Sequence, residues 1–298
     1  MTFINAHRIC WGVEPICRVL QIAPSSYYAA VGRPASVRRQ RDEVLKAEIR
    51  RVWDEHRQVY GADKIWAQLN REGIRVARCT VERLMRELGL RGVVRGQPRV
   101  WTTVGDNASD RPLDLVARQF RAPAPNQLWV ADLTYVKTHS GWVYVAFVVD
   151  ACSRFVVGWQ ASRSLRTDLA LDALEMALWA RRTVSLTGLI HHSDRGVQYL
   201  AIRYTERLAE AGVIPSVGSR GDSYDTALAE SFNGLYKAEL IRHCGPWQGL
   251  DDVEYATLEY VDWFNHRRLH GELGMRPPAE FEALQAGQGT PPLLAASQ

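Results

Sequence analysis

Three carboxylates that are far apart in the sequence could together hold divalent cations. Asp132 lies inside the apolar run 128–136, Asp194 follows a second apolar segment, and Glu230 stands in a helical pattern with 35 residues between it and Asp194. Carboxylate oxygens suit Mg²⁺ or Mn²⁺, which keep open positions for water and phosphate. Two such ions about 3.5–4 Å apart can activate a nucleophile and stabilise a leaving oxygen. The three acids therefore predict a catalytic and metal-binding site for phosphoryl transfer, with two Mg²⁺ or Mn²⁺ ions.

The local setting of each acid supports this prediction. A carboxylate in the middle of a buried strand costs roughly several kcal/mol or takes up a proton, so Asp132 needs a cation, and no Lys or Arg nearby in sequence is an obvious partner. Asp194 stands where a strand ends, the usual place for a site in an α/β sheet. At about 100° per residue, Glu230, Asn233 and Lys237 share one helix face. We therefore expect Asn233 and Lys237 to contact DNA.

A change of pattern near residue 126 marks the start of an α/β region. Three closely spaced apolar runs predict an antiparallel meander, and helices then alternate with two shorter strands. This order is typical of a mixed sheet with helices on both faces. The expected strands are 128–136, 142–149, 155–160, 188–192 and 213–217, and the expected helices are 168–181, 202–211, 226–241 and 250–266.

Upstream of this region the pattern predicts a small all-α unit. Residues 13–30 form two short helical patterns separated at Pro24, which favours a helical hairpin over a helix-turn-helix. Three further helices follow, and the short gap before the third, capped by Thr80, is typical of a helix-turn-helix. Outward basic residues on that helix would contact DNA, although any three-helix bundle has solvated basic residues. The helices are 37–56, 64–70 and 81–88, and the basic residues are Arg78, Arg83 and Arg86.

Charge is distributed unevenly along the 298 residues. Residues 1–125 hold 22 Lys and Arg against 13 Asp and Glu, whereas residues 126–298 hold 15 against 20. A basic front and an acidic back favour nucleic-acid binding joined to a cation-holding unit. Five scattered cysteines suit a reducing cytosol, the start lacks a signal-peptide layout, and no run is long enough to span a bilayer. We therefore expect a cytoplasmic protein without a membrane partner.

These motifs together resemble a known family. The chain is similar to the transposase catalytic chain of a large family of bacterial insertion sequences, whose core resembles retroviral integrases and has the RNase H-like fold. The 35-residue gap matches that family's D,D(35)E pattern, and the similarity covers nearly the whole chain. The matching stretches are 60–70 (YGADKIWAQLN), 128–136 (LWVADLTYV), 149–159 (VDACSRFVVGW), 191–199 (HHSDRGVQY), 219–237 (SRGDSYDTALAESFNGLYK) and 263–277 (WFNHRRLHGELGMRP).

The resemblance implies a reaction and partners. Asp132, Asp194 and Glu230 would be the metal-binding triad of an enzyme that cleaves DNA at element ends and joins them to a target. Its partners would be DNA ends with inverted repeats, target DNA, further copies of itself on DNA, and the product of an upstream reading frame joined by frameshifting. The resemblance also implies that this chain begins at the downstream frame.

The expected organisation follows from these patterns and the resemblance. The basic linker, with Trp101 near its start, could lie along a DNA backbone and stack on bases, or be a solvated connection. The expected units are an N-terminal helical hairpin (1–35), a helix-turn-helix DNA-binding domain (36–92), a basic linker (93–125), an RNase H-like integrase catalytic core (126–285) and a flexible tail (286–298).

Two other functional classes remain open at this point. One is a catalytically inactive DNA-binding regulator of transposition, against which the intact triad argues. The other is an RNase H-like nuclease acting on RNA–DNA hybrids, against which the basic helical front and the insertion-sequence motifs argue. Glycine-rich phosphate loops are absent from the sequence, which argues against ATP use.

Overall fold

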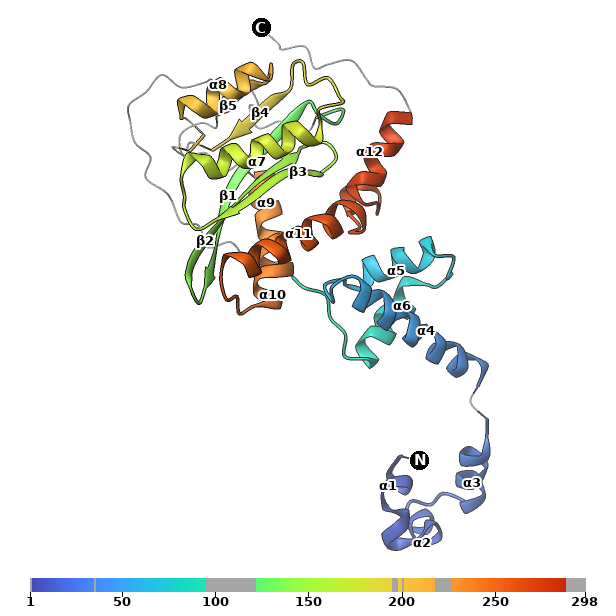
Figure 1. The fold of residues 1–298 in the computed structure, drawn as a ribbon. Helices are drawn as coiled ribbons and strands as arrows, with labels where there is room; N and C mark the ends of the chain where they lie inside the picture. The colour runs from blue at the N-terminus through green and yellow to red at the C-terminus, as the bar shows by residue number, and fades with distance from the viewer. Residues whose placement is uncertain are drawn as a thin grey trace.

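A five-stranded mixed sheet forms the centre of the C-terminal half of the chain (Figure 1). The computed structural model describes residues 2–34, 36–94, 122–194, 198–199, 201–217 and 227–287. Most of the predicted linker, including Trp101, and the tail beyond residue 287 lie outside these residues. The strands are β1 Leu128–Thr138, β2 Gly141–Asp150, β3 Val156–Ser162, β4 Ile190–Ser193 and β5 Ile214–Val217.

The strand order is β3-β2-β1-β4-β5. The first three strands are antiparallel neighbours, which confirms the predicted meander, because only a tight turn joins β1 to β2. Gly141 takes a φ of 118° at that turn, a conformation that a residue with a side chain rarely adopts. β4 and β5 then run parallel to β1 on its other side. The fold class is therefore the mixed, RNase H-like α/β arrangement that the sequence predicted.

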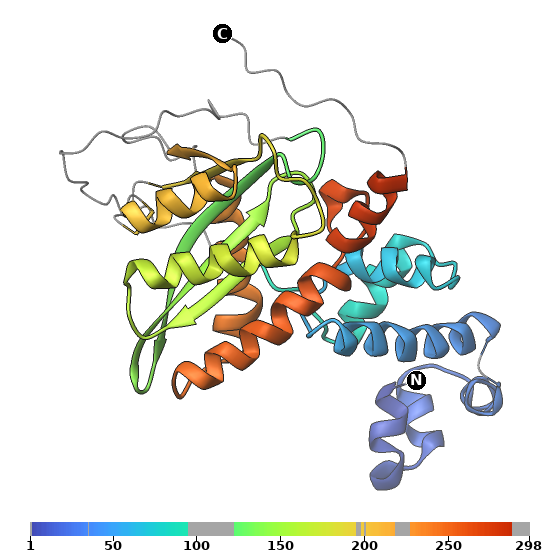
Figure 2. The same cartoon turned by 45° about the horizontal axis from the view of Figure 1, so that its top comes forward.

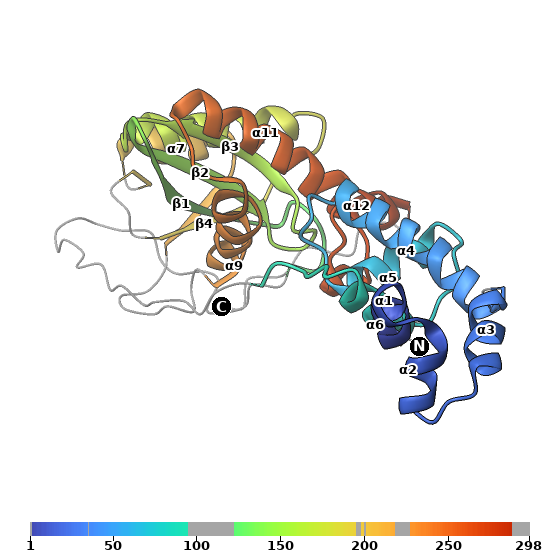
Figure 3. The ribbon, with the colours of Figure 1, turned by 90° about the horizontal axis from the view of Figure 1, so that it is seen from below.

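Helices cover both faces of the sheet, on opposite sides of β1 and β2 (Figure 3). Alternate residues of β1 separate the two cores, since successive strand side chains point to opposite faces. Trp129 and Ala131 join the core beneath α7 and α8, and Val136 joins the core beneath α9 and α11. The covering helices are α7 Thr167–Ala180, α8 Ile202–Glu210, α9 Ala227–Tyr236 and α11 Leu250–His266.

Close approach of α7 to the sheet depends on Gly158 in β3. A Cβ at this position would lie 2.1 Å from the carbonyl oxygen of Ala173, which is not a possible contact. The bare backbone of β3 therefore lets α7 seat its small residues directly on the strand, where Ala173 and Ala177 are fully buried.

The predicted helix 226–241 is one of the places where the structure differs. The α-helix ends at Tyr236, and residues Lys237–Ile241 form a π-helical turn, η1, followed by the short helix α10 Arg242–Cys244. A π-turn is costly unless tertiary contacts hold it. Here the η1 residue Glu239 is buried and ion-paired to Arg268, a residue distant in sequence. The C-terminal segment adds η2 Gly271–Leu273 and α12 Pro278–Gly287, which the sequence analysis did not predict.

The N-terminal part is entirely helical. The expected hairpin contains a third helix, so α1 Thr2–Trp11 precedes α2 Val13–Val19 and α3 Pro24–Gly32. The three-helix unit that follows is α4 Val37–Glu55, α5 Ala62–Arg71 and α6 Arg78–Glu87. The prediction that Thr80 caps the third helix was wrong, because α6 begins three residues earlier than predicted, at Arg78, and Ala77 is its N-cap.

The unit α4–α6 packs against the catalytic half through a buried aromatic contact. The His56 ring stacks on Tyr60 with 4.3 Å between ring centroids, and the Trp263 indole of α11 donates to His56 Nδ1 at 3.3 Å. The Tyr60 hydroxyl accepts from the backbone N–H of Leu269 at 2.7 Å. Figure 2 shows α4–α6 beside α11 and α12. One hydrophobic core therefore runs continuously from this unit into the sheet.

In the parts of the chain that the structure describes, no helix is both long enough and apolar enough to cross a membrane.

Candidate catalytic site

The site lies where β1 and β4 stop pairing. The last pair in their parallel register joins Ala131 to Ser193. Asp132 and Asp194 are the next residues on each strand, so they are neighbours across the same edge of the sheet. Paired positions in a parallel sheet point to the same face. Asp132 points toward the face covered by α9, and Asp194 lies close enough for its charge to act on Asp132.

Helix α9 fixes one of these carboxylates in place. The Asn233 side-chain amide donates to Asp132 Oδ2 at 2.8 Å, and the backbone N–H of Leu133 donates to Asp132 Oδ1 at 2.8 Å. The apolar face of α9 holds the helix against the sheet, since Phe232 and Tyr236 pack edge-to-face on Phe147 at 4.8 and 5.0 Å. The prediction that α9 packs with one face and offers polar groups on the other is confirmed.

The three predicted acids lie close enough to affect one another. The pKa of Asp132 is raised to about 7, chiefly by burial and then by the nearby charges of Asp194 and Glu230. The hydrogen bonds from Leu133 and Asn233 act in the opposite direction because they stabilise the charged form. Repulsion by neighbouring carboxylates is expected to raise the pKa of a carboxyl in this way when no cation lies between them.

The surrounding polar atoms suit a hydrated cation. Asn233 Oδ1 and the Tyr199 hydroxyl are buried, and none of the described residues supplies either with a hydrogen-bond partner. Both lie beside the acids: Asn233 bonds to Asp132, and the charges of Asp132 and Asp194 raise the pKa of Tyr199 after burial. Within the described ranges no three His, Cys, Asp or Glu side chains are grouped closely enough to hold one metal ion. The donor set fits a metal, and coordination would require the acids to draw closer.

The raised pKa of Asp132 predicts how metal binding depends on pH. A carboxyl whose folded pKa is raised holds its proton more tightly in the folded state, so the metal-free protein loses stability as pH rises from about 4 to about 7. Binding of Mg²⁺ requires the deprotonated carboxylate. We therefore expect Mg²⁺ to raise the thermal unfolding midpoint more at about pH 8 than at about pH 5.5, measured by scanning calorimetry. An equal shift at both pH values would contradict this prediction.

Lys237 lies at the end of the same helix face. Burial lowers the pKa of its ammonium group, and the nearby charge of Asp132 partly restores it. The ammonium also lies 4.6 Å from the ring centroid of Tyr135 in β1. Asn233 and Lys237 are therefore both turned toward Asp132, and their contact with DNA stays a prediction.

The three arginines predicted to contact DNA all belong to α6. Arg78 is ion-paired with Asp63, and Arg83 Nη2 lies 2.9 Å from Asp42 Oδ1, which links α6 to α4. Arg86 has the most exposed side chain of the three, at 73%. Arg83 therefore has an evident packing role, whereas Arg86 is the most accessible to a ligand, and DNA contact by each stays a prediction.

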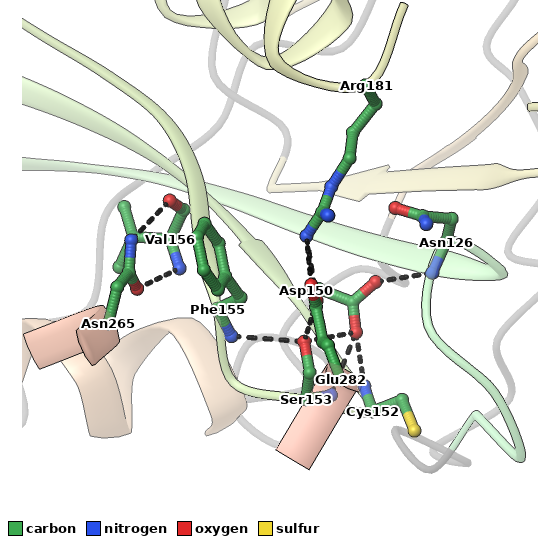
Figure 4. A network of polar contacts seen from close by, with 9 residues as sticks. All are labelled: Asn126, Asp150, Cys152, Ser153, Phe155, Val156, Arg181, Asn265 and Glu282. Atoms are coloured by element: carbon green, nitrogen blue, oxygen red, sulfur yellow. Dashed lines mark hydrogen bonds and ion pairs between the residues drawn. The ribbon is translucent and has the colours of Figure 1, made fainter. Parts of the chain in front are cut away.

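Asp150 has a structural role at the end of β2. It is fully buried at the end of β2 and accepts hydrogen bonds from the backbone N–H groups of Asn126, Cys152 and Ser153 (Figure 4). Burial raises the pKa of this carboxyl against those bonds. The Ser153 hydroxyl lies between Asp150 and Glu282 of α12. Asp150 thus closes the turn between β2 and β3 and helps to attach the C-terminal helix.

Three family models match this chain. An HTH-like domain matches residues 39–98, and two integrase core domain models match residues 122–223 and 211–278. These matches define the class of protein as one with an HTH-like domain followed by an integrase core domain.

Curated relatives narrow this class. A protein assigned as a transposase of insertion sequence element IS986/IS6110 from Mycobacterium tuberculosis is 55% identical over 272 residues, covering 90% of this chain and 98% of the relative. The transposase of insertion sequence element IS629 from Shigella sonnei is 53% identical over 287 residues, covering 95% of each chain. The transposase InsF of insertion sequence IS3A from Escherichia coli K12 is 32% identical over 285 residues, covering 94% of this chain and 97% of the relative. The chain belongs to this family of insertion-sequence transposases, whose function is DNA transposition.

Among solved structures, the catalytic core domain of the HTLV-2 integrase in complex with magnesium matches with a TM-score of 0.42. It is 18% identical and covers 53% of this chain and 97% of that one.

Proposed function

We propose that this chain cuts DNA strands at the ends of an insertion sequence and joins them to a target, with Asp132, Asp194 and Glu230 holding divalent metal ions. The observation that carries the proposal is the proximity of Asp194 and Glu230 to Asp132, because their charges raise the pKa of that carboxyl after burial. Transposase relatives of nearly the same length support it.

The residues of the site would act by positioning and charge. Water or a DNA 3′-hydroxyl attacks the phosphodiester in line, without a covalent enzyme intermediate. Bound Mg²⁺ or Mn²⁺ would activate that nucleophile and stabilise the leaving oxygen. Asn233 and the Leu133 N–H keep the Asp132 carboxylate in one orientation, which a reaction that depends on alignment requires. Lys237 places a positive charge near the same carboxylate and can offset charge on an incoming phosphate.

Other partners follow from the same proposal. The unit α4–α6 would bind DNA at the inverted repeats, with Arg86 as the most accessible of the three predicted contact residues on α6. Assembly of several copies on DNA and association with an upstream-frame product remain predictions from the resemblance, as does a location on the bacterial nucleoid.

The test is a strand-transfer reaction with a matched metal control. The full chain, alone and fused to the upstream-frame product, is incubated with duplexes that carry the terminal inverted repeats and with a target plasmid. With Mg²⁺ we expect nicked ends and joined products on a sequencing gel, and with EDTA we expect neither. Tight binding without cutting in either form would instead support a DNA-binding regulator. Cutting of an RNA–DNA hybrid alone would support an RNase H-like nuclease.

A further inference from the structure

We propose that Tyr135 and Trp142 form a stacking platform for an unpaired nucleobase of the DNA strand that enters the site. This inference rests on the proposed function, since it names how the same site would hold its substrate. The juxtaposition behind it is an exposed aromatic pair, a lysine and the edge of the strand that carries Asp132.

The platform lies on the segment of β1 that has lost one neighbour. β1 pairs with β4 only as far as Ala131, and beyond it none of the described residues pairs with β1 on that side. The strand continues to Thr138 with β2 as its partner. Tyr135 therefore stands three residues beyond Asp132 along an open edge. Strand alternation turns the Tyr135 ring to the face of the sheet opposite to Asp132, and Lys237, whose ammonium feels the charge of Asp132, reaches that ring across the open edge. A single strand that crosses the edge at Lys237 would therefore meet the Tyr135 ring.

Two large aromatic side chains meet there without being covered. Tyr135 is 57% exposed and Trp142 is 50% exposed. Their rings form an edge-to-face pair with 5.4 Å between centroids, joined across the β1–β2 hairpin. Because both rings stay about half exposed to water, the fold does not gain the free energy that burying them in a core would give. Every base has an aromatic face, so such a surface can stack bases of any sequence.

The charge around the pair suits a nucleotide rather than an apolar partner. Lys237 lies 4.6 Å from the Tyr135 ring centroid, reaching over the open edge from η1. Lys137 is exposed and lies opposite Trp142 in the strand register. Two ammonium groups beside two rings match the phosphate and the base of one nucleotide. An apolar protein surface would remove water from both lysines without offering a negative charge or a hydrogen-bond acceptor in return.

The hairpin that carries the rings is held in place. The backbone N–H groups of His139 and Ser140 donate to the carbonyl oxygens of Trp247 and Gln248 at 2.9 and 3.1 Å. The Thr138 hydroxyl also donates to the Gly141 carbonyl at 2.7 Å. A surface fixed in this way loses little conformational entropy when a base stacks on it.

The test measures base stacking in the full chain without metal, so that no cleavage occurs. The probe is a duplex of the element end with a short single-stranded 3′ overhang that contains 2-aminopurine. We expect binding to change the 2-aminopurine fluorescence. Trp142→Leu should remove that change and weaken overhang binding by about 5- to 100-fold, the range for loss of one stacked base. Trp142→Phe keeps an aromatic face and should restore most of the affinity.

Trp179→Leu is the matched control. Trp179 is 68% exposed and has the Arg182 guanidinium 4.2 Å from its ring centroid, but it lies on α7. The proposal is overturned if both leucine variants lose affinity equally or if neither loses any. It is also overturned if Trp142→Leu changes only the oligomeric state in sedimentation, since the pair would then be a protein contact. Repeating the titration with Asp132→Asn separates the platform from the catalytic assignment, because stacking should persist there.

Discussion

Asp132→Asn is expected to abolish both DNA cleavage and strand transfer while leaving DNA binding intact. The amide has nearly the same shape. Its one oxygen can still accept from the Leu133 N–H, and its NH₂ group can donate to Asn233 Oδ1 once the Asn233 amide turns over, so both neighbours keep a hydrogen bond. It has no charge with which to hold a cation. Loss of a single preorganised electrostatic contact costs about 10²–10³-fold in rate, and loss of a metal ligand should cost at least that much. Gel assays of nicked and joined products, with a parallel mobility-shift assay, measure the two effects.

The matched control for this substitution is Asp172→Asn on α7. Asp172 is an exposed acid in the same half of the chain. Its pKa is raised by partial burial and then by the charges of Asp168 and Glu175, which belong to its own helix. This variant should cut and join DNA at the wild-type rate. If Asp132→Asn retained full strand transfer, the assignment of the triad would be wrong, whatever the family of the chain.

Arg268→Met is expected to lower the free energy of unfolding by about 3–5 kcal/mol, the cost of leaving a buried charge without its partner. The Arg268 and Glu239 side chains are only 4% and 6% exposed. Arg268 Nε donates to Glu239 Oε2 at 2.8 Å, and the Tyr260 hydroxyl donates to the same oxygen at 3.0 Å. Methionine fills much of the volume but leaves the Glu239 carboxylate buried without its cation. Urea denaturation measures the change.

Two further variants separate loss of the pair from loss of packing. The double variant Arg268→Met with Glu239→Leu removes both charges and should recover most of the stability, because apolar pairs often replace buried ion pairs at little cost. Arg207→Met breaks a more exposed pair with Glu175 on the opposite face of the sheet. Its effect should stay within about 1 kcal/mol. A loss below that size for Arg268→Met would show that the buried pair does not hold η1.

Features that depend on local patterns were predicted well. Successive side chains of β1 and β2 enter the two cores in turn, so the sequence of each strand shows where its residues point. The 3.6-residue period of α9 places Asn233 on the side of Asp132. The strand-end position of Asp194 follows from the polar residues after an apolar run. These features need only neighbours within a few residues, so the sequence reveals them.

Features that depend on distant contacts were not predicted. The π-turn η1 replaces the expected end of α9, and its residue Glu239 is held by Arg268, 29 residues further along the chain. The start of α6 was placed at Val81 because Thr80 is a good cap, yet the helix begins at Arg78, which is ion-paired with Asp63 of α5. Nothing in local propensity reports either ion pair. The buried tie between Tyr60 and Leu269 is likewise visible only in three dimensions.

The contact between Tyr60 and Leu269 has a consequence for the spacing of the two DNA positions that the protein would contact. Because Tyr60 and His56 share a core with Trp263, the unit α4–α6 cannot swing away from α11 without exposing buried aromatic surface. The two parts therefore keep a fixed separation and orientation. If both parts contact the same DNA, their fixed separation would set the number of base pairs between the sequence that is recognised and the bond that is cut.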